Sequence, residues 1–206
     1  MKRFVSFLLT ALLLAALCPA SALAEEPTAA PEQAKYVDFD NMTFWVNGQP
    51  FTLGVSTLQD MIDAGVAFHE VDLEDANNNL RKNLQSEGFT FDIGANSYAT
   101  VKVLNDTDKG KRLADCVLSR ILVSFSDHPE EMADSILTFA FPYDMTKEQL
   151  MENAGDPDDI SHYDGSRYAS DTIEYKRGGQ RYFGYNRFTF VFHDEVLDYF
   201  YIEYLP

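Results

Sequence analysis

Basic residues are scarce in this chain of 206 residues: 16 lysines and arginines stand against 33 aspartates and glutamates, which gives a net charge of −17. Proteins that bind a phosphate backbone neutralise it with lysine and arginine, so this balance argues against nucleic acid and anionic membrane surfaces as partners. A basic protein or divalent cations fit the charge better, and a weak Ca²⁺ site is one such option.

Long hydrophobic runs are equally rare. The run at residues 4–17 is too short to cross a hydrocarbon core of about 30 Å. It follows Lys2 and Arg3 and precedes a small residue, Ala24, which is the pattern of a cleavable export signal. We therefore predict a signal peptide over residues 1–24, with cleavage after Ala24 and no membrane span, and a protein that is secreted or associated with the cell wall. Loss of Lys2 and Arg3 changes the net charge from −17 to −19.

Cysteine occurs twice, as Cys18 and Cys116. A lipid-modified Cys18 or a retained anchor is the alternative to cleavage, but Leu17 stands where lipoprotein signals place a small residue. The mature chain then has only Cys116, which cannot form an intramolecular disulfide. Its apolar neighbourhood favours a buried, inert thiol over a nucleophile. The fold must be stabilised by its core, and an aromatic content of 14% is consistent with that.

Catalytic signatures are missing from the sequence, which has no G-x-S-x-G, H-E-x-x-H, C-x-x-C, G-x-G-x-x-G or P-loop motif. No two histidines have the i, i+4 spacing of zinc ligands. Residues 106–110 resemble the start of a calcium loop, but Val117 stands where that loop needs a bidentate glutamate. We predict no catalytic residue, no metal centre and no cofactor. The alternative is a hydrolase of cell-wall or dietary polymers.

Turn and cap signals are present in the rest of the chain. Asn47-Gly48 predicts a two-residue hairpin turn, and Pro50 predicts that the returning strand lies at a sheet edge. Residues 56–59, Ser-Thr-Leu-Gln, form a capping box with Ser56 as the N-cap. Gly65 predicts the end of the helix that follows.

The same signals recur 90 residues later. Residues 146–149, Thr-Lys-Glu-Gln, form a second capping box, and an offset of 90 pairs Ser56 with Thr146 and Gly65 with Gly155. This register predicts an internal repeat. Each helix is followed by strand-like segments, at residues 89–93, 98–104 and 116–125, and at 172–176, 182–192 and 196–204.

The predicted fold class is α+β, with two related units that each pack a short capped helix on an antiparallel sheet. A flexible linker over residues 25–35, rich in proline, alanine and glutamate, joins the signal peptide to the first unit. The units cover residues 36–128 and 129–206. Residues 74–86 are ambiguous between a short helix and an ordered loop.

The second unit runs from residues 144–150, Asp-Met-Thr-Lys-Glu-Gln-Leu, through Ala-Gly-Asp-Pro-Asp at 154–158 into aromatic strands. It resembles the helix-then-sheet repeat of β-lactamase inhibitory protein and of SmpA/OmlA-type lipoproteins. The mature chain is also similar to uncharacterised exported proteins of Gram-positive gut bacteria, through residues 53–65 and Cys116-Val117. Because relatives with this fold bind other proteins, the resemblance implies an exported, non-enzymatic binding or adaptor module. It transfers no contact residue, since such contacts lie in loops that differ here.

Three tyrosines are the candidate binding residues. Tyr199 and Tyr201 alternate with apolar residues along the last predicted strand, and Tyr185 precedes a similar alternation. Exposed tyrosines suit recognition because they bury a large area at a low entropic cost. The alternative is cross-strand pairing that only stabilises the sheet. We predict that Tyr185, Tyr199 and Tyr201 contact a protein or an envelope component, with a weak calcium or small-ligand module as the second option.

Overall fold

The computed structural model describes residues 35–94, 97–125, 132, 134–165, 169–179 and 184–206. Residues Ala34–Pro206 form one compact unit. The predicted signal peptide, its cleavage site and, apart from Lys35, the predicted linker lie outside the described residues.

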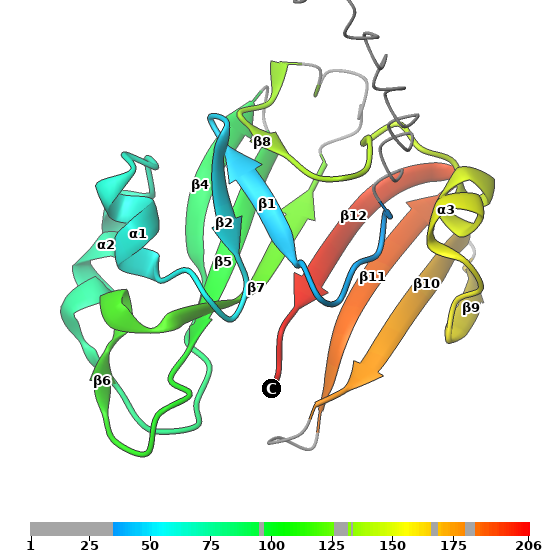
Figure 1. The fold of residues 1–206 in the computed structure, drawn as a ribbon. Helices are drawn as coiled ribbons and strands as arrows, with labels where there is room; N and C mark the ends of the chain where they lie inside the picture. Colours follow the sequence, from blue (N-terminus) through cyan, green and yellow to red (C-terminus); the bar gives the residue numbers. More distant parts are fainter. Residues whose placement is uncertain (1–34, 95–96, 126–131, 133, 166–168, 180–183) are drawn as a thin grey trace, which may run out of the picture. The chain divides into compact units, whose positions relative to one another are not determined.

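One antiparallel sheet of seven strands is the largest element of this unit (Figure 1). From edge to edge its strands are β4 (Phe89–Gly94), β5 (Ser97–Leu104), β7 (Val117–Ser124), β12 (Val196–Glu203), β11 (Tyr185–His193), β10 (Ala169–Gly178) and β9 (Asp159–Asp164). The pair β7–β12 joins strands from the two predicted units. The predicted α+β class with antiparallel strands is therefore confirmed, and the two predicted units contribute to one continuous sheet.

Three shorter strands form a second sheet, in the order β2 (Gln49–Thr52), β1 (Thr43–Val46) and β8 (Leu137–Thr138). The turn between β1 and β2 is the predicted one: Asn47 and Gly48 have φ values of 51° and 76°, as a type I′ turn requires. Pro50 lies on the edge strand β2, as predicted, where its missing N–H is tolerated.

The helices are short, and a small two-stranded sheet lies among the loops. The helical elements are α1 (Leu58–Asp63), α2 (Glu70–Glu74), η1 (Asp75–Asn77), η2 (Leu113–Asp115) and α3 (Lys147–Ala154). The small sheet pairs β3 (Asn79–Leu80) with β6 (Lys111–Arg112). The ambiguous segment at residues 74–86 thus contains the 3-10 turn η1 and β3.

The prediction that Ser56 caps the first helix is wrong by one residue. The hydroxyl of Thr57 accepts a hydrogen bond from the Asp60 N–H at 3.2 Å, and the Asp60 carboxylate accepts one from the Thr57 N–H at 2.7 Å. Ser56 instead accepts a hydrogen bond from the Thr52 N–H at 3.0 Å. Its hydroxyl therefore stabilises the turn after β2 and is not available to the helix.

The second capping box is confirmed. The Thr146 hydroxyl accepts from the Gln149 N–H at 3.2 Å, and the Gln149 side chain accepts from the Thr146 N–H at 2.9 Å. Gly65 and Gly155 end their helices with φ values of 80° and 85°, as predicted. The observed N-caps, Thr57 and Thr146, are 89 residues apart (146 − 57), whereas the two glycines are 90 apart (155 − 65).

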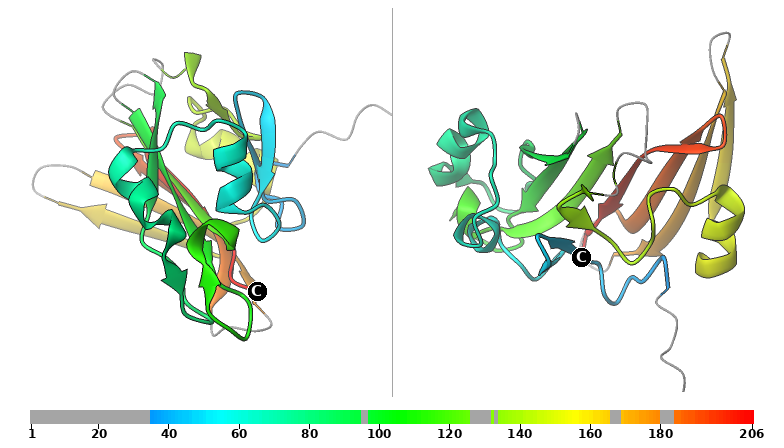
Figure 2. Two further views of the ribbon diagram at one scale, coloured as in Figure 1. Left: turned by 90° about the vertical axis from the view of Figure 1, so that its left-hand side faces the viewer. Right: turned by 90° about the horizontal axis from the view of Figure 1, so that it is seen from above.

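The hydrophobic core lies on one face of the seven-stranded sheet, between it and the β2-β1-β8 sheet. The ring of Phe139 meets that of Phe200 edge-on at a centroid distance of 4.9 Å and that of Phe44 at 6.1 Å. Leu58 of α1 and Leu150 of α3 join the same core and are fully buried. Figure 2 shows β1, β2 and α3 on this side of the large sheet. One face of the large sheet is thereby closed.

Candidate functional site

The opposite face of the seven-stranded sheet carries mostly polar and aromatic side chains, and we call it the open sheet face. Among the described elements, β1, β2 and α3 lie on the other side, and α2 lies at the β4 edge (Figure 2). Cross-strand partners project from the same face of a sheet. Read from β4 towards β9, the register gives three rows: Asp92, Tyr98, Ser124, Tyr199, Val191, Thr172, Ser161; Thr90, Thr100, Leu122, Tyr201, Thr189, Glu174, Asp159; and Lys102, Arg120, Glu203, Arg187, Lys176.

All three predicted tyrosines lie on the open sheet face. Tyr199 and Tyr201 project from β12 and are half-buried, while Tyr185 projects from the start of β11 and is 52% exposed. Tyr185 lies at the far end of β11 from the residues that pair with Tyr199 and Tyr201. The structure therefore brings two of them together and places the third on the same face at some distance along the strand.

Sequence reasoning missed two residues of this face, Tyr98 and Arg120. Tyr98 is 45% exposed and adds another tyrosine on β5. The guanidinium of Arg120 lies over the ring of Tyr201, 4.1 Å from its centroid, which is a cation–π contact. The signal for Arg120 was its position in the otherwise apolar strand at residues 117–123, where alternation assigns it to the face opposite the core.

Ion pairs hold the polar side chains of β10, β11 and β12 in place. The Arg187 Nε lies 3.2 Å from a carboxylate oxygen of Glu203, and Gln85 donates to the other Glu203 oxygen at 3.4 Å. Lys176 lies 2.6 Å from Glu174, and this hydrogen bond raises the pKa of the lysine. Side chains fixed in this way lose less conformational freedom when a partner binds.

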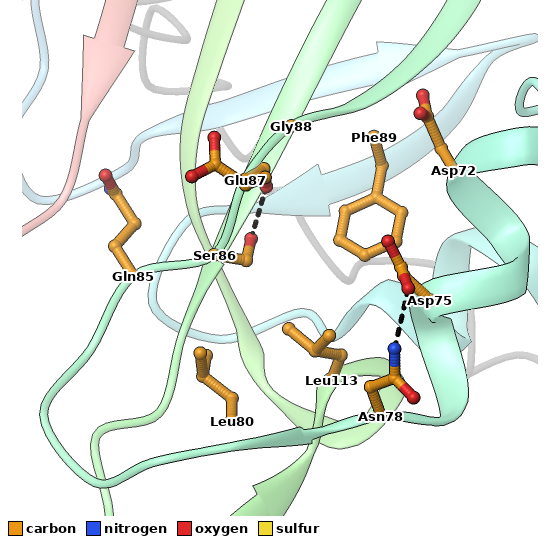
Figure 3. Close-up of a pocket in the computed structure, with 10 residues that line it drawn as sticks. All are labelled: Asp72, Asp75, Asn78, Leu80, Gln85, Ser86, Glu87, Gly88, Phe89 and Leu113. Carbon is orange, nitrogen blue, oxygen red and sulfur yellow. Dashed lines mark hydrogen bonds between the residues drawn. The ribbon is translucent and has the colours of Figure 1, made fainter.

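A separate pocket of about 370 Å³ lies next to the β4 edge, between α2, η1 and the loop that leads into β4 (Figure 3). It is lined by Asp72, Asp75, Asn78, Leu80, Gln85, Ser86, Glu87, Gly88, Phe89 and Leu113. In Figure 3 the apolar side chains of Leu80, Phe89 and Leu113 lie between the carboxylates of Asp72, Asp75 and Glu87. An apolar floor with an acidic rim suits a cation on an apolar stem, such as an alkylamine.

Two of the pocket carboxylates also stabilise the local backbone and side chains. The Asp72 carboxylate accepts a hydrogen bond from the Thr90 N–H at 2.7 Å, and that of Asp75 accepts one from the Asn78 amide at 2.6 Å. Glu87 is exposed at the rim. The described residues contain no group of three or more histidine, cysteine, aspartate or glutamate side chains that could hold a metal ion.

The described histidines pair with single carboxylates. His69 lies 3.3 Å from Asp92, and His162 lies 2.6 Å from Asp171. Asp171 also pairs with Lys147 of α3, and the hydrogen bond from that lysine, followed by the one from His162, lowers the pKa of the Asp171 carboxyl. His128 lies outside the described residues. The Lys147–Asp171 pair fixes α3 on the sheet.

The loop at residues 106–110 is stabilised by a neighbouring asparagine. The Asn105 amide donates to the Leu80 and Lys109 carbonyl oxygens at 2.8 and 2.7 Å, and its oxygen accepts from the Thr107 hydroxyl at 2.6 Å. These bonds explain the loop without a bound ion. Cys116 is fully buried, and burial raises the pKa of its thiol to about 11, which does not favour a nucleophile.

No protein-family model matches the chain, and comparison with curated proteins and with solved structures finds no match either. The resemblance stated above therefore stays a prediction. Within the part of the chain that the structure describes, no helix is long and apolar enough to cross a membrane.

Proposed function

We propose that this chain is an exported, non-enzymatic binding module that recognises another protein or an envelope component through its open sheet face. The observation that carries the proposal is the composition of that face, which gathers Tyr98, Tyr199, Tyr201, Arg120 and Arg187 on neighbouring strands. Tyrosine and arginine are enriched among the residues that contribute most to protein–protein affinity. The three tyrosines predicted from the sequence take part in this surface.

The size of the open sheet face suits such an interface. Seven strands spaced by about 4.8 Å span roughly 29 Å. Strands of 8 residues, at about 3.3 Å per residue, span roughly 26 Å. The product is roughly 750 Å², close to the ~800 Å² that each partner buries in an interface of standard size. A rigid, preformed surface of this area supports recognition without large rearrangement.

The two-unit hypothesis belongs to the same proposal. We infer that residues 36–128 and 129–206 are related halves, each a capped helix followed by antiparallel strands. Their last strands, β7 and β12, pair antiparallel at the middle of the sheet, as a two-fold relation between halves requires. The one-residue difference between the cap and glycine offsets is explained by a single insertion within one helix. The resemblance to β-lactamase inhibitory protein supports protein binding on the same grounds.

Affinity capture tests the proposal. The mature chain, residues 25–206, is immobilised and exposed to secreted and envelope fractions of the native host. We expect a saturable partner whose retention falls at least tenfold when Tyr98 and Tyr201 are both replaced by alanine, since loss of two central contacts costs ~2 kcal/mol or more. The matched control is Val55→Ala, which removes an apolar side chain that is 72% exposed and lies outside the open sheet face. Equal loss in both variants would refute the assignment of the surface.

A second candidate function, binding of a small cationic ligand, is favoured by the pocket beside β4. Its apolar floor and acidic rim fit an alkyl polyamine. Titration with spermidine, followed by calorimetry, is expected to show saturable binding that Glu87→Gln weakens. Heat changes that are identical in the two proteins would rule out this pocket as the site.

A further inference from the structure

The third row of the open sheet face holds cations that lack carboxylate partners. Lys102 of β5 and Arg120 of β7 lie directly opposite each other in the antiparallel register. Among the described residues, neither side chain forms a hydrogen bond or an ion pair, although the chain has 33 acidic residues and 16 basic ones. In so acidic a chain, two adjacent unpaired cations call for an explanation.

Other cations of the described chain do find carboxylates. Ion pairs join Arg112 to Asp115 at 2.6 Å, Arg177 to Asp40 at 2.7 Å, Lys176 to Glu174 at 2.6 Å and Arg187 to Glu203 at 3.2 Å. Each of these pairs balances a positive charge locally. The Lys102–Arg120 pair departs from this pattern.

The one carboxylate nearest in register does not neutralise the pair. Glu203 lies opposite Arg120 on β12, but its oxygens accept from Arg187 and Gln85. With Lys102, Arg120 and Arg187 against Glu203, this part of the row has a net charge of +2 (3 − 1). Like charges directly opposite each other on paired strands are destabilising.

Arg120 is also held in a fixed position. Its guanidinium lies 4.1 Å over the ring of Tyr201, and its Nε is buried without a hydrogen-bond acceptor. A buried donor without an acceptor is costly, so an unpaired group of this kind in a folded protein needs a reason. The terminal nitrogens of a stacked guanidinium remain a planar fork that matches a carboxylate in a bidentate arrangement.

We propose that Lys102 and Arg120 form an anion-binding site in the open sheet face, which binds a carboxylate on an acidic segment of the protein partner. This inference rests on the proposed function of that face. A bound carboxylate balances the two facing cations and satisfies donors of Arg120. Glu203 beside the site limits the bound group to low charge, which favours a single aspartate or glutamate side chain over a polyphosphate. The strongly negative remainder of the chain acts in the same direction.

The test is an NMR titration of the mature chain with a triglutamate peptide, with inorganic phosphate as the second arm. We expect the peptide to give saturable shifts of the Arg120 side-chain Nε–H resonance and of the Lys102 amide. Lys102→Gln is expected to weaken peptide binding about tenfold, because it removes one charge-assisted contact. The matched control, Lys109→Gln, loses the same charge from an exposed loop and is expected to change affinity less than twofold.

Arg120→Lys keeps the charge but removes the fork, and is expected to weaken binding at least tenfold; its melting temperature shows whether it remains folded. An absence of saturable shifts, or equal weakening by Lys102→Gln and Lys109→Gln, would overturn the site. Shifts with phosphate but not with the peptide would overturn the carboxylate assignment. Partner capture that depends on Tyr201 but is unchanged in Lys102→Gln and Arg120→Lys would leave the proposed function in place and reject this site alone.

Discussion

Replacing Phe200 with alanine is expected to destabilise the whole described unit, because this residue lies where its two halves meet. Phe200 is fully buried on β12, the central strand of the seven-stranded sheet. Its ring lies 4.9 to 6.3 Å, centroid to centroid, from five others, which are Phe125, Phe139, Phe141, Tyr143 and Phe190.

The magnitude follows from these contacts. Removal of a buried phenylalanine costs about 3–5 kcal/mol through lost transfer free energy and the cavity left behind. Each aromatic pair adds about 0.5–1.5 kcal/mol beyond buried area, so five pairs place Phe200→Ala at the upper end, about 5 kcal/mol. Phe200→Leu keeps most of the volume and is expected to cost about 1.5 kcal/mol. Tyr185→Ala, at an exposed position, is expected to change stability by less than about 0.5 kcal/mol.

Urea unfolding followed by near-UV circular dichroism measures these differences. With an m-value of about 2 kcal/mol per molar urea, 5 kcal/mol lowers the midpoint by roughly 2.5 M, and Phe200→Leu brings the effect into range if the alanine variant does not fold. A single transition is expected for all folded variants, since one sheet and one core cross the boundary near residue 128. Two separate transitions, or a loss below about 1 kcal/mol for Phe200→Ala, would refute this account of the core.

Three further predictions concern single side chains. At pH 8 the Cys116 thiol, with its pKa of about 11, is roughly 0.1% ionised and fully buried, so a thiol reagent should label it only in urea; labelling of the native protein within minutes would contradict its burial. Thr146→Ala removes the N-cap of α3 and should lower stability by about 1 kcal/mol in urea unfolding, whereas an unchanged midpoint would mean that the cap contributes nothing. The lowered pKa of Asp171 stabilises the fold above about pH 4, and this contribution is lost as pH falls through the folded-state pKa. Lys147→Met should raise the Asp171 pKa in a carbon-13 NMR titration, and no shift would mean that the ion pair does not form in solution.

Much of the local structure could be predicted because it depends on short-range signals. Asn47-Gly48 specified its turn, and Thr146 specified the start of α3. Where two candidates lay side by side, at Ser56 and Thr57, the choice depended on a hydrogen bond to Thr52 that the sequence pattern does not encode.

The strand β9 was missed for a different reason. All residues of Asp159–Asp164 are exposed, so no burial pattern marks them as a strand. They are extended because β10 offers a complete row of pairing partners, with Ile160 opposite Ile173. Structure that is imposed by a neighbour cannot be deduced from the segment alone.

The candidate site could be predicted only in part. Period-two alternation placed Tyr199 and Tyr201 on one face of their strand. The opposition of Lys102 and Arg120 depends on the register between β5 and β7, including the irregularity between Lys102 and Val103, which shifts every later pair. Register across distant strands is a property of the assembled sheet, and no local pattern reveals it.

The strand order has a consequence for how the chain folds. Residues Val196–Glu203 form the fourth strand of seven, although they follow every other strand in the sequence. A nascent chain that has emerged only as far as β11 lacks the strand that joins β7 to the rest, so its two partial sheets expose apolar faces. Such non-local pairing makes folding slow and leaves intermediates prone to aggregate. Completion of the core therefore waits until the segment at residues 196–203 is available, and the chain stays unfolded, and competent for translocation, until then.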